Sequence, residues 1–224
     1  MGYSIIEKIG VRYRAIFREG YSDSMEQLTP QDQDKMAEVS QICMSHSATA
    51  LNMLVRKKIV ISPPSVKVVN SADIKNILTA FGMGSVTVQI DYKDDFHCNN
   101  LLMLKENDIK IIMDLMMGGA GVAAPGELNE MHLSCVSELM NQMMGSSAIA
   151  LTGMIHKTVD INPPKATLVN SKEDIDAIDY LPFEWKQMVI VLSRFDGEGL
   201  LKGIMIRIYP MKETRFICDN FTMK

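Results

Sequence analysis

One stretch of the chain places an acid and an amide at the spacing of a helix surface. In SCVSELMNQ, which starts at residue 134, Ser134, Glu138 and Asn141 follow one another at intervals of four and three residues. At about 100° per residue, these side chains share one stripe of a helix, about one turn apart. Such a stripe offers water a carboxylate and a carboxamide in a fixed relation. The chemistry it indicates is hydrogen bonding by an acid and an amide.

The same arrangement recurs 100 residues earlier. Residues 28–53 align without a gap on residues 128–153, and residues 59–74 align on residues 159–174. The identical pairs include Leu28/Leu128, Glu38/Glu138, Met44/Met144, Ser47/Ser147, Ala48/Ala148, Leu51/Leu151, Pro63-Pro64/Pro163-Pro164 and Val69/Val169. This agreement indicates one supersecondary unit used twice, so a surface site built on it is expected twice. An exposed acid and amide are most often only a solvated face, and the duplicated context is what favours a function.

Helix signals precede both polar stripes. Thr29 followed by Pro30 is a good N-cap and N1 pair, Asp32 adds negative charge to the first turn, and helix-forming residues continue to about residue 54. The second copy predicts a helix over about 127–154. Its apolar residues fall opposite the polar stripe, among them Val136, Leu139, Met140, Met143 and Leu151. Each helix is therefore expected to bury one face and expose the stripe.

Extended segments follow each helix. Residues 59–69 and 159–169 are rich in β-branched residues and contain a proline pair, so they are predicted as edge strands that bend at the prolines. Further predicted strands are 86–92, 99–106, 187–195 and 200–210, the last two joined by an Asp-Gly-Glu-Gly turn. Residues 108–117 predict another helix.

A Gly- and Ala-rich break, MGGAGVAAPGE, divides the two copies. It lacks the GxxxxGK[ST] pattern, so a linker is favoured over a phosphate-binding loop. The resulting division, in chain order, is an N-terminal segment 1–27 for which a helix is one candidate structure, a first repeat 28–117, a linker 118–126, a second repeat 127–210 and a C-terminal tail 211–224.

Composition excludes several classes of protein. Of 224 residues, 47% are hydrophobic and 22% charged, with a net charge of -4 and no Lys/Arg cluster, which argues against nucleic-acid binding. No apolar run reaches the ~20 residues of a membrane helix, and we expect a cytoplasmic protein. The four cysteines form no CxxC pair and the four histidines are dispersed, so neither a disulfide framework nor a metal site is expected.

The second stripe resembles the active-site signature of the CheC/CheX/FliY family of chemotaxis phosphatases. That signature is [DS]xxxExxN on a helix, followed after 22 residues by a proline, and Ser134, Glu138, Asn141 and Pro164 match it. The resemblance covers roughly residues 28–210. The sequence SELMNQMMGSSAIAL is more similar to the CheC-like middle domain of the FliY branch than to CheC itself.

The resemblance implies an α/β (α+β) fold of pseudo-twofold symmetry, with long helices packed on a largely antiparallel sheet. It also implies hydrolysis of the aspartyl phosphate of a CheY-type response regulator. Asn141 would orient the attacking water, Glu138 would contact a lysine of the substrate, and Pro164 would shape the floor beside the helix. Mg²⁺ would belong to the response regulator, and no cofactor of the chain's own is expected. This fits a chain without a Ser-His-Asp arrangement.

The first copy departs from the signature at one position. Asp34, Glu38 and Pro64 match it, but Gln41 stands where the family has Asn. Glutamine carries the same carboxamide one methylene further out, and a displacement of about 1 Å can cost on the order of 100-fold in rate. Glu38 and Gln41 are therefore candidate catalytic residues of a first site whose activity the sequence leaves open.

Other roles within the same family stay open. The main rival to an enzyme is a structural or docking module of the flagellar switch, resembling the middle domain of FliM and contacting CheY, FliM, FliN or FliG. A CheC-like partnership with the deamidase CheD is a third possibility. FliY proteins usually carry a C-terminal FliN-like domain, for which the chain has no room after its second repeat, so a truncated piece and a stand-alone relative are both possible. We expect a monomer, since the pseudo-symmetry can satisfy the sheet edges internally.

Overall fold

The computed structural model describes residues 28–178 and 187–221. The predicted N-terminal segment, residues 1–27, lies outside this part of the chain. In chain order the described elements are α2 (Pro30–Val55), β1 (Val60–Ile61), β2 (Ser65–Asn70), α3 (Ser71–Gly82), β3 (Ser85–Asp94), β4 (Cys98–Lys105), α4 (Glu106–Met116), α5 (Glu130–Ile155), β5 (Val159–Ile161), β6 (Lys165–Val169), α6 (Lys172–Asp176), β7 (Gln187–Gly197), β8 (Leu201–Pro210) and α7 (Met211–Asn220). The predicted long helices and strands are all present.

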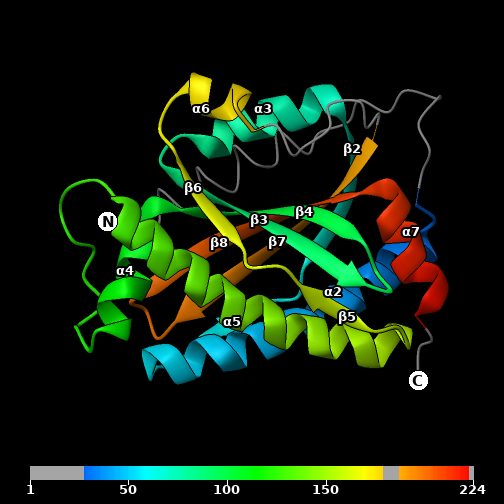
Figure 1. Cartoon of the computed structure of the whole chain (residues 1–224), viewed down its shortest axis with the longest axis horizontal. Coiled ribbons are helices and arrows are strands. Elements are labelled where there is room, and N and C mark those ends of the chain that lie inside the picture. The colour runs from blue at the N-terminus through cyan, green and yellow to red at the C-terminus, as the bar shows by residue number, and fades with distance from the viewer. Residues whose placement is uncertain (1–27, 179–186, 222–224) are drawn as a thin grey trace.

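The strands form one antiparallel sheet in the order β1-β7-β8-β4-β3-β5, with β2 also paired to β7 and β6 also paired to β3. The hairpins β3–β4 and β7–β8 occupy equivalent places in the two repeats, and β4 pairs with β8 at the centre. Figure 1 shows the strands crossing the middle of the molecule, with the long helices below them. The predicted mixed α/β, largely antiparallel fold is confirmed.

The two repeats exchange their edge strands. The proline-interrupted strands β1 and β2 of the first repeat pair with β7 of the second, while β5 and β6 of the second repeat pair with β3 of the first. In both cases the proline pair lies between the two short strands, where no ladder hydrogen bond is required of it. The repeats therefore share one sheet, and each needs the other to complete its edge.

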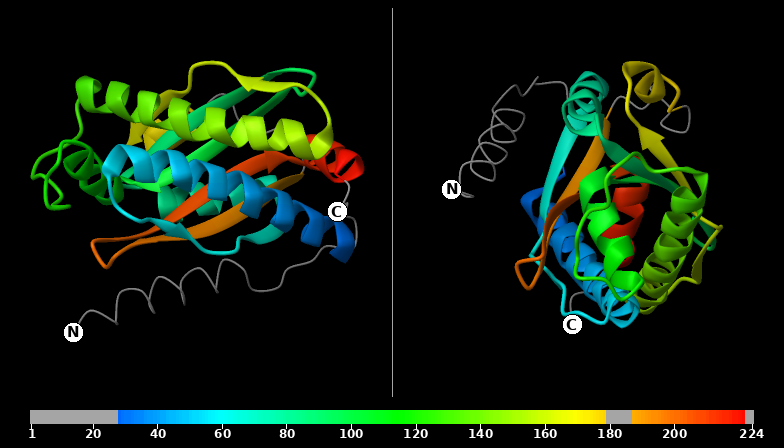
Figure 2. Two further views of the ribbon diagram at one scale, coloured as in Figure 1. Left: turned by 90° about the horizontal axis from the view of Figure 1, so that it is seen from below. Right: turned by 90° about the vertical axis from the view of Figure 1, so that its left-hand side faces the viewer.

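Helices cover both faces of the sheet. One core lies beneath α2, α4, α5 and α7, and includes Leu102 and Leu104 of β4. The other lies beneath α3 and α6, and includes Leu101 and Met103 of the same strand. Because successive residues of a strand point to opposite faces, the central strand is apolar at every one of these positions. Figure 2 shows α2 and α5 side by side on one side of the sheet.

Capping residues set the ends of the two long helices. Thr29 accepts a hydrogen bond from the backbone of Asp32, whose carboxylate accepts in return from the backbone N–H of Thr29, which confirms the predicted start of α2. α5 begins at Glu130, slightly later than predicted, because Asn129 is its N-cap and accepts from the backbone N–H of His132.

The residues that are identical in the two long helices mostly lie where α2 and α5 pack together. Ser47 donates to the carbonyl of Met143 at 2.9 Å, and Ser146 donates to the carbonyl of His46 at 3.3 Å. The identical positions buried in both helices are Met44/Met144, Ser47/Ser147, Ala48/Ala148 and Leu51/Leu151. Glu38 and Glu138 are also identical, yet both are exposed. Packing therefore explains the first set and does not explain the glutamates.

Three helices were absent from the sequence prediction: α3, α6 and α7. The last of these occupies most of the predicted tail 211–224 and packs against α2 and the β7–β8 hairpin. Residues 118–126 contain no helix or strand, and they are held on α4 by Asp114, whose carboxylate accepts from the backbone N–H groups of Gly121 and Val122 at 2.8 and 3.0 Å.

The side chain of Asp108 on α4 is buried, which disfavours the charged form of its carboxyl group. Asp108 is 8% exposed, and this burial raises its pKa to about 6, although the nearby Lys105 ammonium acts in the opposite direction. The folded-state pKa of Asp108 lies above the unfolded-state value. Its contribution to the free energy of unfolding is therefore fully present below about pH 4 and is lost as the pH rises through about 6.

We therefore expect Asp108→Asn to raise the free energy of unfolding at pH 8 by about 2 kcal/mol and to change it little at pH 4. Denaturant melts at the two pH values measure this difference. An equal effect at both would show that ionisation of Asp108 is not its cause.

Candidate active site

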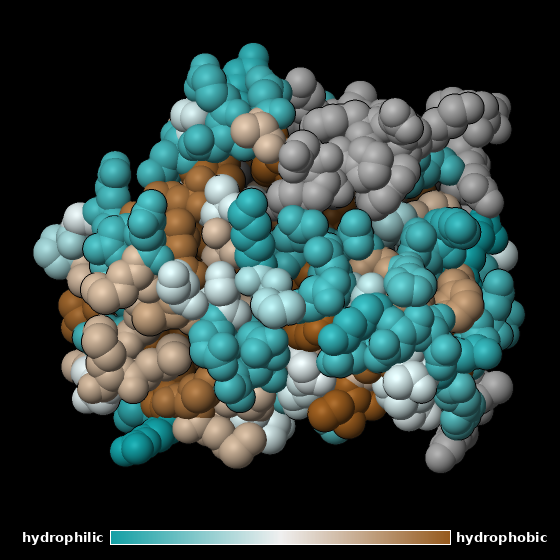
Figure 3. Space-filling model, in the orientation of Figure 1, coloured by the Kyte–Doolittle hydropathy of each residue, from teal (hydrophilic) through white to brown (hydrophobic). Residues whose placement is uncertain are grey.

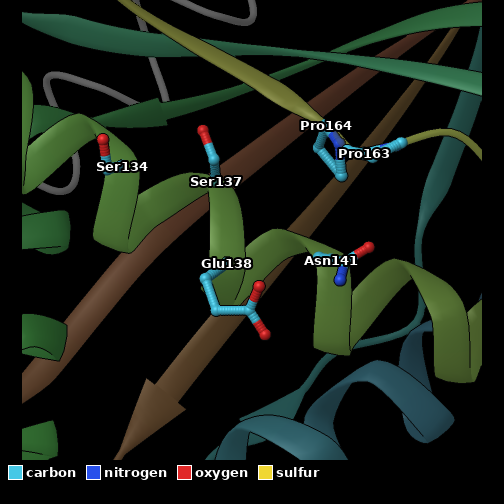
Figure 4. Close-up of a pocket in the computed structure, with 6 residues that line it drawn as sticks. All are labelled: Ser134, Ser137, Glu138, Asn141, Pro163 and Pro164. Carbon is cyan, nitrogen blue, oxygen red and sulfur yellow. The ribbon is translucent and has the colours of Figure 1, made fainter.

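The second predicted site forms a pocket on the exposed face of α5. Glu138 is exposed and Asn141 is half-buried, on successive turns. An open pocket of about 240 Å³ is lined by Ser134, Ser137, Glu138, Asn141, Pro163 and Pro164. Figure 4 shows Glu138 and Asn141 on one side of α5, with the proline pair across from Asn141. The structure thus brings together the four residues predicted for this site.

A serine that the sequence analysis did not single out ties the proline pair to the helix. Ser137 donates to the carbonyl of Leu133 at 3.0 Å and accepts from the backbone N–H of Ala166 at 3.1 Å. Ala166 follows Pro164 by two residues, so this bond fixes the distance between α5 and the wall of the pocket. The first copy has Ala37 at the equivalent position, and this difference between the repeats was the available sequence signal.

A second overlooked residue holds the acid. The side-chain amide of Gln142 donates to Oε1 of Glu138 at 2.8 Å, one turn along the helix. The carboxylate keeps its remaining acceptor capacity for a group outside the chain. In the first copy Ile42 stands in place of Gln142, so Glu38 has no such neighbour.

The amide of Asn141 is free to bind water. Within residues 28–178 and 187–221 its side chain has no hydrogen-bond partner, although it is half-buried in the pocket wall. Ser134, in contrast, donates to the carbonyl of Glu130 at 3.0 Å, which binds its hydroxyl to the preceding turn. The arrangement can therefore orient a water molecule through Asn141, and it gives Ser134 no activating base.

The first predicted site is built differently. Asp34 and Glu38 are exposed on α2, and Pro64 lies half-buried between β1 and β2. The side-chain oxygen of Gln41, however, is buried and has no hydrogen-bond partner, while its amide nitrogen lies 3.5 Å from Oγ of Ser45. The longer side chain lies along its own helix toward Ser45, and its oxygen is not presented to solvent as an acceptor.

The rest of the described chain adds no competing site. Among the described residues no group of three or more His, Cys, Asp or Glu side chains is placed to hold a metal ion. Cys43, Cys98 and Cys218 are buried thiols whose pKa values are raised by burial, and Cys135 is exposed. None of the described helices is long and apolar enough to cross a membrane.

Comparison with known proteins identifies the class. The model of the CheC-like family matches residues 131–168, a range that holds most of α5 and the proline pair. The chain is 34% identical over 187 residues to the flagellar motor switch phosphatase FliY of Bacillus subtilis (strain 168). The match covers 84% of this chain and 48% of that protein, so the chain spans about half the length of the curated relative.

Comparison with solved structures identifies the branch of this family. The crystal structure of Thermotoga maritima FliY superposes with a TM-score of 0.78 at 32% identity, covering 88% of this chain and 98% of that one. This chain belongs to the FliY family.

Two more distant structures share the fold alone. The FliM middle domain from H. pylori gives a TM-score of 0.65 at 11% identity, over 87% of this chain and 100% of that one. The CheX–CheY–BeF3–Mg²⁺ complex from Borrelia burgdorferi gives 0.51 at 13% identity, over 77% and 97%.

Proposed function

We propose that this chain is a phosphatase for the aspartyl phosphate of a CheY-type response regulator, acting at or near the cytoplasmic face of the flagellar motor switch. The observation that carries the proposal is the pair of exposed Glu138 and half-buried Asn141, one turn apart in a pocket walled by Pro164. Membership of the FliY family, one of whose members is named a phosphatase, supports the same reaction.

The mechanism needs little from the protein. An aspartyl phosphate is already reactive, and its hydrolysis chiefly requires a water molecule held in line with phosphorus while charge on the equatorial oxygens is neutralised. The amide of Asn141 orients that water from the pocket wall. The Mg²⁺ that neutralises the phosphoryl oxygens is part of the substrate protein, in keeping with the CheY–BeF3–Mg²⁺ unit bound by CheX of Borrelia burgdorferi.

Glu138 has a positioning role. Its exposed carboxylate, steadied by Gln142, makes a charge-assisted hydrogen bond to a lysine of the response regulator. This contact fixes α5 against the phosphorylated surface and brings Asn141 to the water. Ser137 fixes the distance between α5 and the pocket wall through its hydrogen bond with Ala166. Pro164 shapes that wall and takes no part in the reaction.

Activity is assigned to the second site. The first site retains Glu38 but presents a buried amide oxygen at Gln41, and it lacks the counterparts of Ser137 and Gln142. We therefore propose that Glu38 and Gln41 contribute little to hydrolysis. The rival role, a docking module of the switch, draws on the fold shared with FliM and would require neither an accessible amide nor a pocket beside it.

The test is the rate of phosphate loss from Mg²⁺-bound phosphorylated CheY of the source organism. We expect the chain to accelerate this loss well above the intrinsic rate when present in substoichiometric amounts. Binding of phosphorylated CheY with an unchanged rate of phosphate loss would favour the docking module instead.

A further inference from the structure

The exposed face of α5 carries two large apolar side chains besides its polar pair. Met131 is 67% exposed and Ile149 is 73% exposed, while their helix buries an extensive apolar face elsewhere. Taking about 100° per residue, Met131, Glu138 and Ile149 point within roughly 20° of one direction. One apolar side chain therefore lies on each side of the glutamate along a single line.

The intervening positions continue the same line. Cys135, Gln142 and Gly145 complete a run with alternating spacings of four and three residues from Met131 to Ile149. Gly145 adds no side chain, and a Cβ placed there meets nothing within 4 Å. The line thus has an apolar group at each end and a polar centre. Its length is about 27 Å, which is comparable to the width of an ordinary protein interface.

The other long helix lacks these end groups. At the positions equivalent to Met131 and Ile149, α2 has Gln31 and Thr49, and Thr49 donates back to the carbonyl of Ser45 at 3.0 Å. Its exposed methionine is Met53, which is 71% exposed near the end of the helix and corresponds to Gly153 of α5. The two repeats therefore differ in the surface around their glutamates as well as in the amide.

The position of Glu138 and Asn141 indicates which partner would cover Met131 and Ile149. A water molecule held by Asn141 can attack phosphorus only if the surface of the phosphorylated protein covers the pocket of Glu138 and Asn141, which adjoins this line. A folded protein domain placed there also covers the helix turns on either side, since its width exceeds the spacing of Glu138 from Met131 and from Ile149. Two exposed apolar side chains then become buried at no cost to the fold of the chain.

We propose that Met131 and Ile149 are the docking anchors for the phosphorylated response regulator, and that they direct it to α5 rather than α2. This inference rests on the proposed function for the choice of partner. It assigns recognition to the ends of the line and positioning to Glu138 at its centre, while the chemistry stays with Asn141 in the pocket beside the line. Figure 3, seen from the side on which α5 lies in front, shows hydrophilic side chains interspersed with separate hydrophobic patches.

The experiment measures binding apart from hydrolysis. CheY of the source organism, loaded with Mg²⁺ and beryllofluoride, is titrated into the chain and into Met131→Gln, Ile149→Gln and the double variant. We expect the dissociation constant to rise about tenfold for each single change and further for the double, since anchors of this kind carry much of the affinity of an interface. Met53→Gln is the matched control and should leave binding unchanged.

The outcomes separate this inference from the proposed function. Weakened binding by the α5 variants alone supports the anchors, whether or not wild type speeds phosphate loss. Unchanged binding by the double variant, or equal weakening by Met53→Gln, overturns them even if the chain is an active phosphatase. Where hydrolysis is measured, the double variant should raise KM for phosphorylated CheY and leave kcat within about twofold, because Asn141 is untouched.

Discussion

Replacing Asn141 by alanine should abolish most of the acceleration of phosphate loss from phosphorylated CheY, with a fall in kcat of about 100-fold or more. The amide is the group in the pocket that can orient water, and losing one oriented donor or acceptor in a transition state typically costs that much. Asn141 is half-buried and has no hydrogen-bond partner among the described residues, so its removal should leave stability nearly unchanged. A single-turnover assay with excess enzyme measures the chemical step directly.

The matched control is supplied by the repeat itself. Gln41→Ala makes the equivalent truncation in the first site and should lower the rate by less than twofold, since the amide oxygen there is buried. Asn141→Gln transfers the first site's residue to the second and should also lose most activity. An equal loss for Gln41→Ala and Asn141→Ala would overturn the assignment of activity to the second site alone.

The sequence predicted the arrangement of the site because its parts are local. Helix periodicity puts Ser134, Glu138 and Asn141 on one stripe, and the 100-residue repeat revealed that Glu138 was duplicated although packing does not require it. The predicted cap at Thr29 and the edge strands bent at proline pairs are local signals of the same kind. Each depends on a few neighbouring residues, which a sequence displays directly.

What the sequence did not predict depends on contacts between distant segments. The bond from Ala166 to Ser137 joins a strand to a helix 29 residues away, and only the fold shows that the two meet. The exchange of edge strands between repeats is a choice of pairing partner that alternation of side chains does not specify. The helix α3, in contrast, had a local signal that was overlooked, since its buried apolar residues follow helical spacing after the N-cap Asn70.

The β7–β8 hairpin provides the largest expected effect on stability. Gly203 pairs with Phe195, and the aromatic ring lies over the glycine where a side chain would stand. A Cβ at this position would overlap Cζ and Cε2 of Phe195 and lie 2.7 Å from Oδ2 of Asp108. Phe195 is itself buried, and the cavity beside it has a volume of only about 10 Å³, so the ring has little room to move. We expect Gly203→Ala to lower the free energy of unfolding by about 3 kcal/mol, by overpacking.

A Gly→Ala substitution in α5 should instead raise the free energy of unfolding. Gly153 lies in the last turn of α5, and a Cβ there meets nothing within 4 Å, so Gly153→Ala should add about 0.5 kcal/mol through helix propensity and a less flexible unfolded chain. Chemical denaturation of both variants beside wild type decides the point. A small or stabilising effect of Gly203→Ala would mean that Phe195 moves aside cheaply.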